Sequence, residues 1–188
     1  RREIMNKKLK KLNINFTLIE GVEGRKKYKN YKKFTKLRPG QLGCLLSHIN
    51  ILKDAKKNNY QNILIFEDDI LFTNNFKQKI LNVYSNILKN EKDFDLIYLG
   101  CSQQHNWKNL NIKDGYYQGH KMDGTFAMII NNRVLSKVIE EGNKLLLPID
   151  RIYVNFIQNN NKSYCCHPSL VTVNNYVFSN TEITNTNK

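Results

Sequence analysis

The sequence lacks the features that mark membrane-spanning, secreted or zinc-ribbon proteins. It has no apolar run near the roughly 20 residues that a membrane-spanning helix needs, and no secretory signal pattern at its start. Its four cysteines form no CxxC pair, so we expect free thiols in a reducing compartment. These absences favour a cytoplasmic globular protein.

Acidic residues are also scarce, since 16 Asp and Glu stand against 30 Lys and Arg, for a formal net charge of +14. The lysines are spread along the whole chain, as a general lysine and asparagine bias would leave them, so the charge alone does not favour a nucleic-acid partner. Basic residues cluster, with interleaved tyrosines, at residues 24–38. We interpret this segment as a solvated loop. Contact with single-stranded nucleic acid, an anionic membrane surface or an anionic substrate stays open as the alternative.

The length of 188 residues and the hydrophobic content of 40% predict one domain at residues 1–178, followed by a polar tail at 179–188. Helix and strand patterns alternate along the chain, as they do in an α/β domain. The predicted helices are 3–12, 40–58, 76–90, 133–142 and 150–158. The predicted strands are 15–20, 62–66, 94–100 and 124–130, with a terminal strand pair within 164–173.

The stretch NILIFEDDILF holds the first candidate site, because a hydrophobic strand runs directly into Glu67, Asp68 and Asp69. Unpaired buried carboxylates are costly, so these acids must reach water, a cation or hydrogen-bond donors. They follow the carboxyl end of strand 62–66, where open α/β sheets bind ligands. On an extended chain, residues i and i+2 share a face, so we expect Glu67 and Asp69 to point together and Asp68 to point away. Such a pair can hold Mg²⁺ or Mn²⁺.

A second pair of acids, Asp93 and Asp95, has the spacing of a metal-binding pair. These residues precede the strand LIYLG, which puts them at its amino end and away from the ligand edge. We therefore interpret them as solvated acids or turn formers.

Five segments occur in one order along nearly the entire chain, from about residue 1 to 173. They read PGQLGCLLSHINIL, NILIFEDDILF, FDLIYLG, GTFAMIINNRVLSKVI and LPIDRIY. Together they resemble glycosyltransferase family 25, which includes bacterial lipooligosaccharide galactosyltransferases and the procollagen galactosyltransferases. The resemblance implies a GT-A-like, Rossmann-type nucleotide-sugar-binding domain with a central mixed sheet flanked by helices. It also implies an inverting reaction and a UDP-hexose donor, used with Mn²⁺ or Mg²⁺.

Two departures from the family pattern accompany this resemblance. Family members begin with a strand and a turn that helps to bind the nucleotide base, and the opening RRE looks like the tail of that turn. We therefore expect the first strand, and with it part of the donor site, to lie upstream. Met128 replaces the family's usual tyrosine and is expected to alter the pocket.

Carried over residue by residue, the resemblance implies that Asp69 binds the metal and the diphosphate. Glu67 or Asp68 would then contact the ribose or a metal-bound water. Asp150 is implied as the general base that takes the proton of the acceptor hydroxyl, and a helix N-cap is its alternative role. His167 is a candidate additional metal ligand.

Two further groups of residues belong to the expected site. Cys44 and His48 stand one helical turn apart, with Ser47 alongside, close enough to share a ligand. No acidic partner for a nucleophilic site is evident, so we expect this helix face to pack under the donor site, with Gly43 allowing close approach. We also expect His48 to form a hydrogen bond with the carboxylate segment.

The long connection between Cys101 and Asp123 is typical of a binding loop or lid. It contains Trp107, Tyr116 and Tyr117, and aromatic faces stack on sugars, so we expect acceptor contacts there. A disordered surface loop is the alternative.

The sequence thus predicts an inverting transferase that moves galactose or glucose from a UDP-sugar to a hydroxyl of a glycan, lipooligosaccharide or hydroxylysine-type acceptor. Lipopolysaccharide biosynthesis is the pathway that this implies. Two alternatives stay open: a non-catalytic relative that binds a nucleotide sugar or glycan, and a metal-dependent nuclease or phosphotransferase that uses the same carboxylates.

Overall fold

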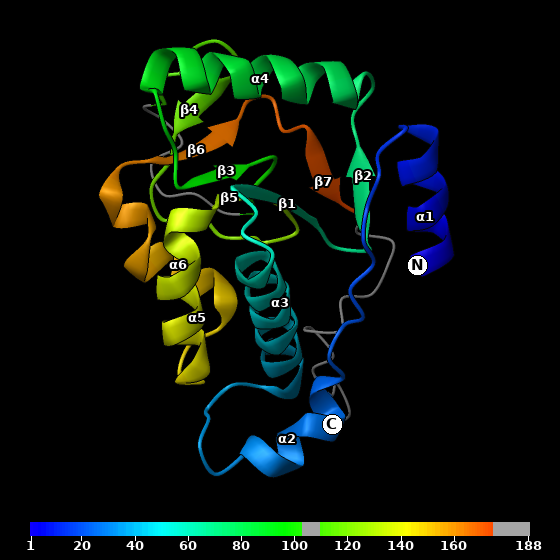
Figure 1. Cartoon of the computed structure of the whole chain (residues 1–188), viewed down its shortest axis with the longest axis vertical. Coiled ribbons are helices and arrows are strands. Elements are labelled where there is room, and N and C mark those ends of the chain that lie inside the picture. The colour runs from blue at the N-terminus through cyan, green and yellow to red at the C-terminus, as the bar shows by residue number, and fades with distance from the viewer. Residues whose placement is uncertain (103–109, 175–188) are drawn as a thin grey trace, which may run out of the picture.

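The computed structural model describes residues 1–102 and 110–174, which form a mixed β-sheet with helices on both faces (Figure 1). The predicted α/β class is therefore confirmed. The helices are α1 (Arg2–Lys11), α2 (Gly24–Tyr31), α3 (Pro39–Lys57), α4 (Phe76–Glu91), α5 (Leu135–Asn143) and α6 (Ile149–Phe156), with short 3₁₀ turns η2 (Asn132–Val134) and η3 (Gln158–Asn160).

The main sheet has five strands in the order β1-β5-β3-β6-β4. Only β3 and β6 pair in parallel, and the other neighbours are antiparallel. A separate two-stranded sheet joins β2 and β7. The strands are β1 (Asn62–Phe66), β2 (Ile70–Phe72), β3 (Leu96–Tyr98), β4 (Tyr116–Gln118), β5 (Ala127–Asn131), β6 (Ser163–Cys166) and β7 (Val171–Val173).

The sheet separates two hydrophobic cores, because successive side chains of a strand point to opposite faces. Leu96 and Tyr98 of β3 join the core beneath α3, α5 and α6, whereas Ile97 between them joins the core beneath α4 and α1. Adjacent Cys165 and Cys166 divide in the same way. All four cysteines are free, as expected.

The N-terminal part of the chain differs most from the predicted elements. Residues 15–20 are irregular rather than a strand, since they pair with no strand of the described residues, and Phe16 and Leu18 are about 40% exposed. The basic segment predicted as a loop begins with helix α2. Lysine has a favourable helix propensity, but a helix of this length is marginal alone, so packing of α2 against α3 stabilises it.

Two strand assignments also differ from prediction. The long connection after Cys101 contains strand β4, which pairs with β6 and becomes an edge of the main sheet. The terminal strands β6 and β7 exist but do not pair with each other, since β6 lies between β3 and β4 while β7 pairs with β2. None of the helices in the described residues is long and apolar enough to cross a membrane.

Candidate active site

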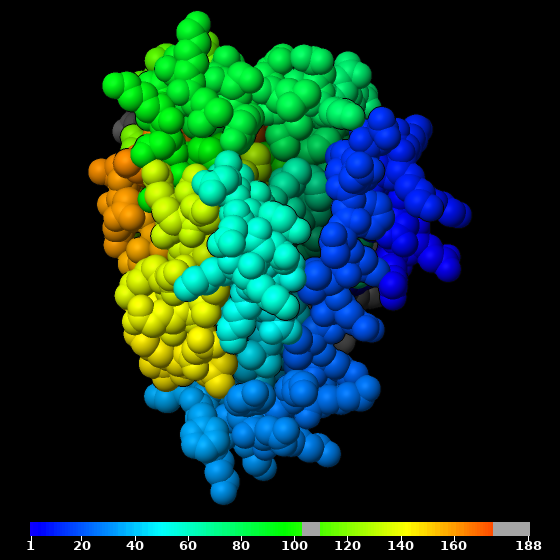
Figure 2. All heavy atoms as spheres, viewed as in Figure 1, coloured from blue at the N-terminus to red at the C-terminus, as the bar shows by residue number. Residues whose placement is uncertain are grey.

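A cavity of about 950 Å³ lies between helix α3, strand β1 and the N-terminal segment. We call it the α3–β1 cavity. Its lining includes α1, the irregular residues 14–23, one side of α3 from Pro39 to Ala55, and the carboxylate turn at residues 67–69. Figure 2 shows the N-terminal segment, in blue, lying along α3, in cyan. Small-molecule sites typically enclose about 300–1,000 Å³, so the cavity can hold a ligand of nucleotide-sugar size.

Ser47 and Gly43 hold the N-terminal segment against α3. The Ser47 hydroxyl accepts a hydrogen bond from the backbone N–H of Val22 over 2.8 Å and donates one to the Gly43 carbonyl over 2.7 Å. A Cβ atom on Gly43 would lie only 2.7 Å from the Val22 carbonyl oxygen, so the close approach requires glycine here. The expectation for Gly43 is confirmed, and Ser47 is a structural link in the cavity wall.

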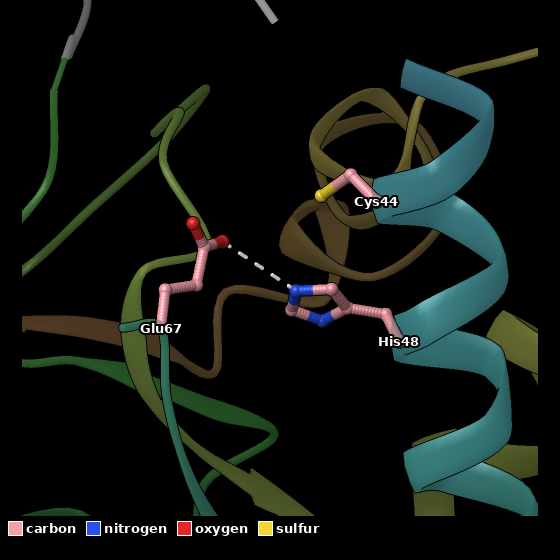
Figure 3. A group of neighbouring side chains, drawn as sticks. All are labelled: Cys44, His48 and Glu67. Carbon is pink, nitrogen blue, oxygen red and sulfur yellow. Dashed lines mark ion pairs between the residues drawn. The ribbon is translucent and has the colours of Figure 1, made fainter. Parts of the chain in front are cut away.

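His48 and Glu67 meet across the cavity wall, with 3.6 Å between Nε2 of His48 and Oε1 of Glu67 (Figure 3). The His48 side chain is only 4% exposed. Burial alone would lower the pKa of His48, but hydrogen bonds and charge from Cys44 and Glu67 outweigh it and raise that pKa to about 10. Burial acts to raise the pKa of Glu67, and its contact with His48 gives a net lowering. The expected contact between His48 and the carboxylate segment is therefore present.

The carboxylate turn is not a continuation of strand β1. After Phe66 the chain bends, and Asp68 and Asp69 both approach the guanidinium group of Arg1, at 3.7 and 3.8 Å. The side chain of Asp68 is 55% exposed and that of Asp69 only 11%, and the charge of Glu67 acts on Asp69 more strongly than that of Asp68 does. The predicted arrangement, with Glu67 and Asp69 together and Asp68 directed away, is therefore present in outline, and Glu67 also contacts His48.

Asp69 has the electrostatic environment of a cation ligand. Within the described residues, its Oδ1 atom is buried and has no hydrogen-bond partner. Burial, followed by the charge of Glu67, raises the pKa of Asp69 above its usual value. An unpaired buried carboxylate oxygen is costly, and a bound divalent cation would remove that cost. The residues present therefore fit the metal that the sequence resemblance implies.

Asp150 lies in the first turn of α6, which begins after the N-cap residue Pro148. Its carboxylate is half-buried and accepts a hydrogen bond from the backbone N–H of Arg151 over 2.8 Å. Asp150 is thus not the N-cap, and it is not among the residues that line the α3–β1 cavity. Its role as a general base stays a prediction.

His167 is exposed at the end of β6, and it also lies outside the lining of the α3–β1 cavity. Its ring makes an edge-type contact with the ring of Tyr117, with 6.2 Å between centroids. The structure therefore does not bring His167 into the wall that Asp69 shares with Glu67.

The expected acceptor residues have a different environment from the one predicted. Tyr116 and Tyr117 are each only 2% exposed, because strand β4 carries them into the two cores, so their ring faces are not free to stack on a sugar. The Tyr116 hydroxyl donates to Glu91 over 2.7 Å. Trp107 lies outside the described residues.

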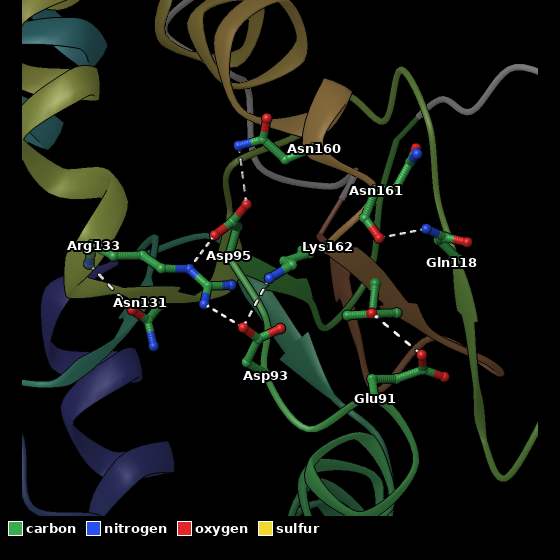
Figure 4. A network of polar contacts seen from close by, with 10 residues as sticks. Glu91, Asp93, Asp95, Gln118, Asn131, Arg133, Asn160, Asn161 and Lys162 are labelled. Carbon is green, nitrogen blue, oxygen red and sulfur yellow. Dashed lines mark hydrogen bonds and ion pairs between the residues drawn. The ribbon is translucent and has the colours of Figure 1, made fainter.

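The second pair of acids forms a structural network at the opposite end of the strands (Figure 4). Arg133 donates hydrogen bonds to both Asp93 and Asp95, and Lys162 donates to Asp93 over 2.9 Å. The side chain of Asp95 is only 4% exposed, so its interpretation as a solvated acid is wrong. Its place away from the carboxylate turn agrees with the prediction, because β1 and β3 run in the same direction and Asp95 precedes β3.

Comparison with known protein families shows the family to which the chain belongs. The family model described as "Glycosyltransferase family 25 (LPS biosynthesis protein)" matches residues 1–127. The chain belongs to glycosyltransferase family 25. The matched residues include the whole lining of the α3–β1 cavity and the carboxylate turn.

Some relatives in this family are named as galactosyltransferases and others as inactive family members. Procollagen galactosyltransferase 1-A of Xenopus laevis is 34% identical over 115 residues, which cover 53% of this chain and 19% of that protein. Procollagen galactosyltransferase 1 of Danio rerio is 30% identical over 118 residues, 61% of this chain and 20% of that protein. Inactive glycosyltransferase 25 family member 3 of Homo sapiens is 27% identical over 135 residues, 70% of this chain and 23% of that protein. The matches span about a fifth of these relatives.

Proposed function

We propose that this family 25 glycosyltransferase is an inverting hexosyltransferase that uses a UDP-sugar, with galactose or glucose as the sugar transferred. The observation that carries the proposal is the buried, unpartnered oxygen of Asp69 in the lining of the α3–β1 cavity. A diphosphate brings both negative charge and the divalent cation that such an oxygen favours. The names of the galactosyltransferase relatives support the same donor class.

In this proposal Asp69, with Asp68 beside it, would hold Mn²⁺ or Mg²⁺. The ion supplies positive charge that neutralises the leaving diphosphate. Arg1 adds a fixed positive charge beside both carboxylates, and its guanidinium can also pair with phosphate oxygens.

On the acceptor side of the reaction, the proposed general base is Asp150. We retain Asp150 as the candidate base for the acceptor hydroxyl, because its carboxylate is half-buried at the start of α6 and its neighbour Arg151 is paired with Asp123 over 2.7 Å. The acceptor classes proposed are a glycan, a lipooligosaccharide of the lipopolysaccharide pathway, or a hydroxylysine-type side chain.

Exposed cationic side chains gather around α2, together with Phe34, which is 70% exposed, and we call this surface the basic tip. We propose that the enzyme is cytoplasmic and that the basic tip makes peripheral contact with an anionic membrane. Basic side chains near an anionic surface contribute about 1 kcal/mol each, and an exposed aromatic ring adds apolar contact. The cationic members are Arg25, Lys26, Lys27, Lys29, Lys32, Lys33, Lys36 and Arg38.

A non-catalytic nucleotide-sugar-binding protein is the second candidate function, because some relatives are named inactive or probable inactive family members, among them a Rattus norvegicus protein that is 34% identical over 67 residues. The nuclease or phosphotransferase alternative has less support. It needs several carboxylates around Asp69, and in the part of the chain that the structure describes the only group of three close potential ligands contains one carboxylate, Glu67.

Thermal unfolding with UDP and Mn²⁺, added separately and together, tests the proposal. Ligand at about 100 times its dissociation constant adds about 2.7 kcal/mol of stability, which raises Tm by roughly 5–10 °C for a chain of this size. A rise only with both present supports a diphosphate–metal site, and the absence of any rise contradicts it. Transfer from UDP-galactose and UDP-glucose then separates the enzyme from a protein that binds without turnover.

A further inference from the structure

We propose that Cys44, His48 and Glu67 form a second metal site, which binds a zinc-type transition-metal ion rather than the Mg²⁺ or Mn²⁺ of a diphosphate. Each of the three residues offers one ligand atom, and these atoms all lie within 4.8 Å of one another. Figure 3 shows the Cys44 sulfur and the near nitrogen of His48 on the side of α3 that faces the Glu67 carboxylate. The inference rests on this geometry and is independent of the transferase activity.

The local structure explains why these atoms meet. Residues four apart on a helix lie one above the other on the same face, which places Cys44 above His48 on α3. Glu67 follows the last residue of β1, and its backbone N–H donates to the Phe126 carbonyl over 2.8 Å, which fixes the end of the strand opposite that helix face.

The distances suit a tetrahedral ion. Zinc binds imidazole nitrogen and carboxylate oxygen at about 2.0–2.2 Å, so two such ligands on a tetrahedron lie about 3.4 Å apart. Nε2 of His48 and Oε1 of Glu67 are 3.6 Å apart, so this pair needs only a few tenths of an ångström of adjustment. The Cys44 sulfur lies within 4.8 Å of the other two ligand atoms.

The ligand types select the class of metal. A thiolate and an imidazole are softer ligands than carboxylates and favour zinc, cobalt or copper(I), whereas Mg²⁺ and Mn²⁺ prefer oxygen ligands. Asp68 and Asp69 provide only oxygen and approach Arg1 instead. The two sites therefore share a cavity wall but differ in the ions that they select.

The surroundings supply a second layer of contacts and a path of entry. The hydroxyl of buried Thr125 donates to Oε1 of Glu67 over 3.1 Å, which holds the carboxylate in the orientation that ligation needs. All three proposed ligands line the α3–β1 cavity, so an ion can reach them, and a fourth position would face that cavity. Three protein ligands with one open position are the usual arrangement of exchangeable or catalytic zinc.

Cobalt(II) provides the test, because it replaces zinc and gives a thiolate charge-transfer band in the near ultraviolet. The reduced, chelator-treated protein is titrated with Co²⁺, and we expect this band with tetrahedral visible bands that disappear when Zn²⁺ is added. Absence of a charge-transfer band at saturating Co²⁺ overturns the proposal and leaves His48 and Glu67 as an ion pair only.

Matched variants assign the band to these residues. Cys44→Ser should abolish the charge-transfer band, whereas Cys101→Ser, which changes another half-buried free thiol, should leave it unchanged. A band that persists in Cys44→Ser overturns the assignment. If far-UV circular dichroism shows that Cys44→Ser is unfolded, His48→Gln provides the same decision through loss of the tetrahedral visible bands.

Two further variants separate this site from the carboxylates at Asp69 and test its surroundings. Asp69→Asn should leave the cobalt spectrum unchanged, even where it removes stabilisation by UDP and Mn²⁺. Thr125→Val should weaken Co²⁺ binding by about 10- to 100-fold, as loss of a supporting hydrogen bond does at other metal sites. Loss of the cobalt bands in Asp69→Asn would contradict the proposal that the two metal sites are separate.

Discussion

The imidazole of His48 lies 3.6 Å from the carboxylate of Glu67, and this contact joins the middle of helix α3 to the carboxyl end of strand β1. Because His48 is almost fully buried and Glu67 faces the α3–β1 cavity, the pair is both part of the packing of α3 on the sheet and part of the ligand-binding wall. Substitutions of these residues should therefore change stability as well as binding.

Glu67→Ala should destabilise the metal-free protein by about 1–3 kcal/mol, because it leaves the buried imidazole of His48 without the carboxylate that faces it at 3.6 Å. Chemical denaturation in the presence of a chelator measures this change. Glu140→Ala is the matched control, since Glu140 is 61% exposed on α5 and should stay within about 0.5 kcal/mol of the wild type. Equal midpoints for Glu67→Ala and the wild type would contradict the structural role of the pair.

Asp69→Asn should abolish hexose transfer while leaving the fold intact. The substitution keeps the shape of the side chain and removes a charge that burial disfavours, so stability should be equal to or higher than that of the wild type. Transfer activity and the joint UDP and Mn²⁺ thermal shift provide the readouts. Asp54→Asn, which removes an exposed carboxylate elsewhere in the cavity lining, serves as the control. Full metal-dependent transfer by Asp69→Asn would refute the site assignment.

Arg133→Ala should destabilise the protein by about 3 kcal/mol without changing donor binding. The substitution leaves buried Asp95 without its charged partner, and the value is at the low end for buried pairs because Arg133 itself is about one-third exposed. Urea denaturation measures the loss. Lys79→Ala, on the exposed face of α4, provides a control that removes one positive charge without breaking a buried pair.

Acid should weaken the same network. Hydrogen bonds from Lys162 and Arg133 lower the pKa of Asp93 below its usual value of 3.8. An acid with a lowered folded-state pKa contributes stability that is present above the unfolded-state pKa and is lost as the pH falls through the folded-state pKa. Asp93→Asn should therefore lose stability at pH 6 and show a smaller further loss below pH 4 than the wild type. Parallel curves of stability against pH would exclude this contribution.

The basic tip should bind vesicles that contain anionic lipid. Reversing two charges with Lys32→Glu and Lys33→Glu removes at least about 2 kcal/mol of attraction, so affinity in a co-sedimentation assay should fall about 30-fold or more. The variant with Lys10→Glu and Lys11→Glu has the same net charge but alters exposed lysines of α1. A similar loss in both variants would indicate a response to total charge rather than to the basic tip.

Strong local patterns predicted the elements that carry the site. The apolar run before Glu67 predicted strand β1. The helical spacing of apolar residues after Pro39 predicted α3. Both signals are contained in a short stretch of sequence, so they can be recognised without the tertiary structure. The contact between His48 and the carboxylate segment also followed from that spacing. The predicted strand at residues 15–20 is absent, because a strand also needs a neighbouring strand to pair with, and the local sequence pattern does not specify one.

Sequence by itself determined the α/β class, the family, and the carboxylate turn at residues 67–69 as the candidate ligand edge. Tertiary structure alone decided which side chains meet there: it turned Asp68 toward Arg1, buried Tyr116 and Tyr117, and brought Cys44 within ligand distance of Glu67. The physical reason is that periodicity specifies which face of an element is buried, whereas the residue opposite that face is set by how distant elements pack.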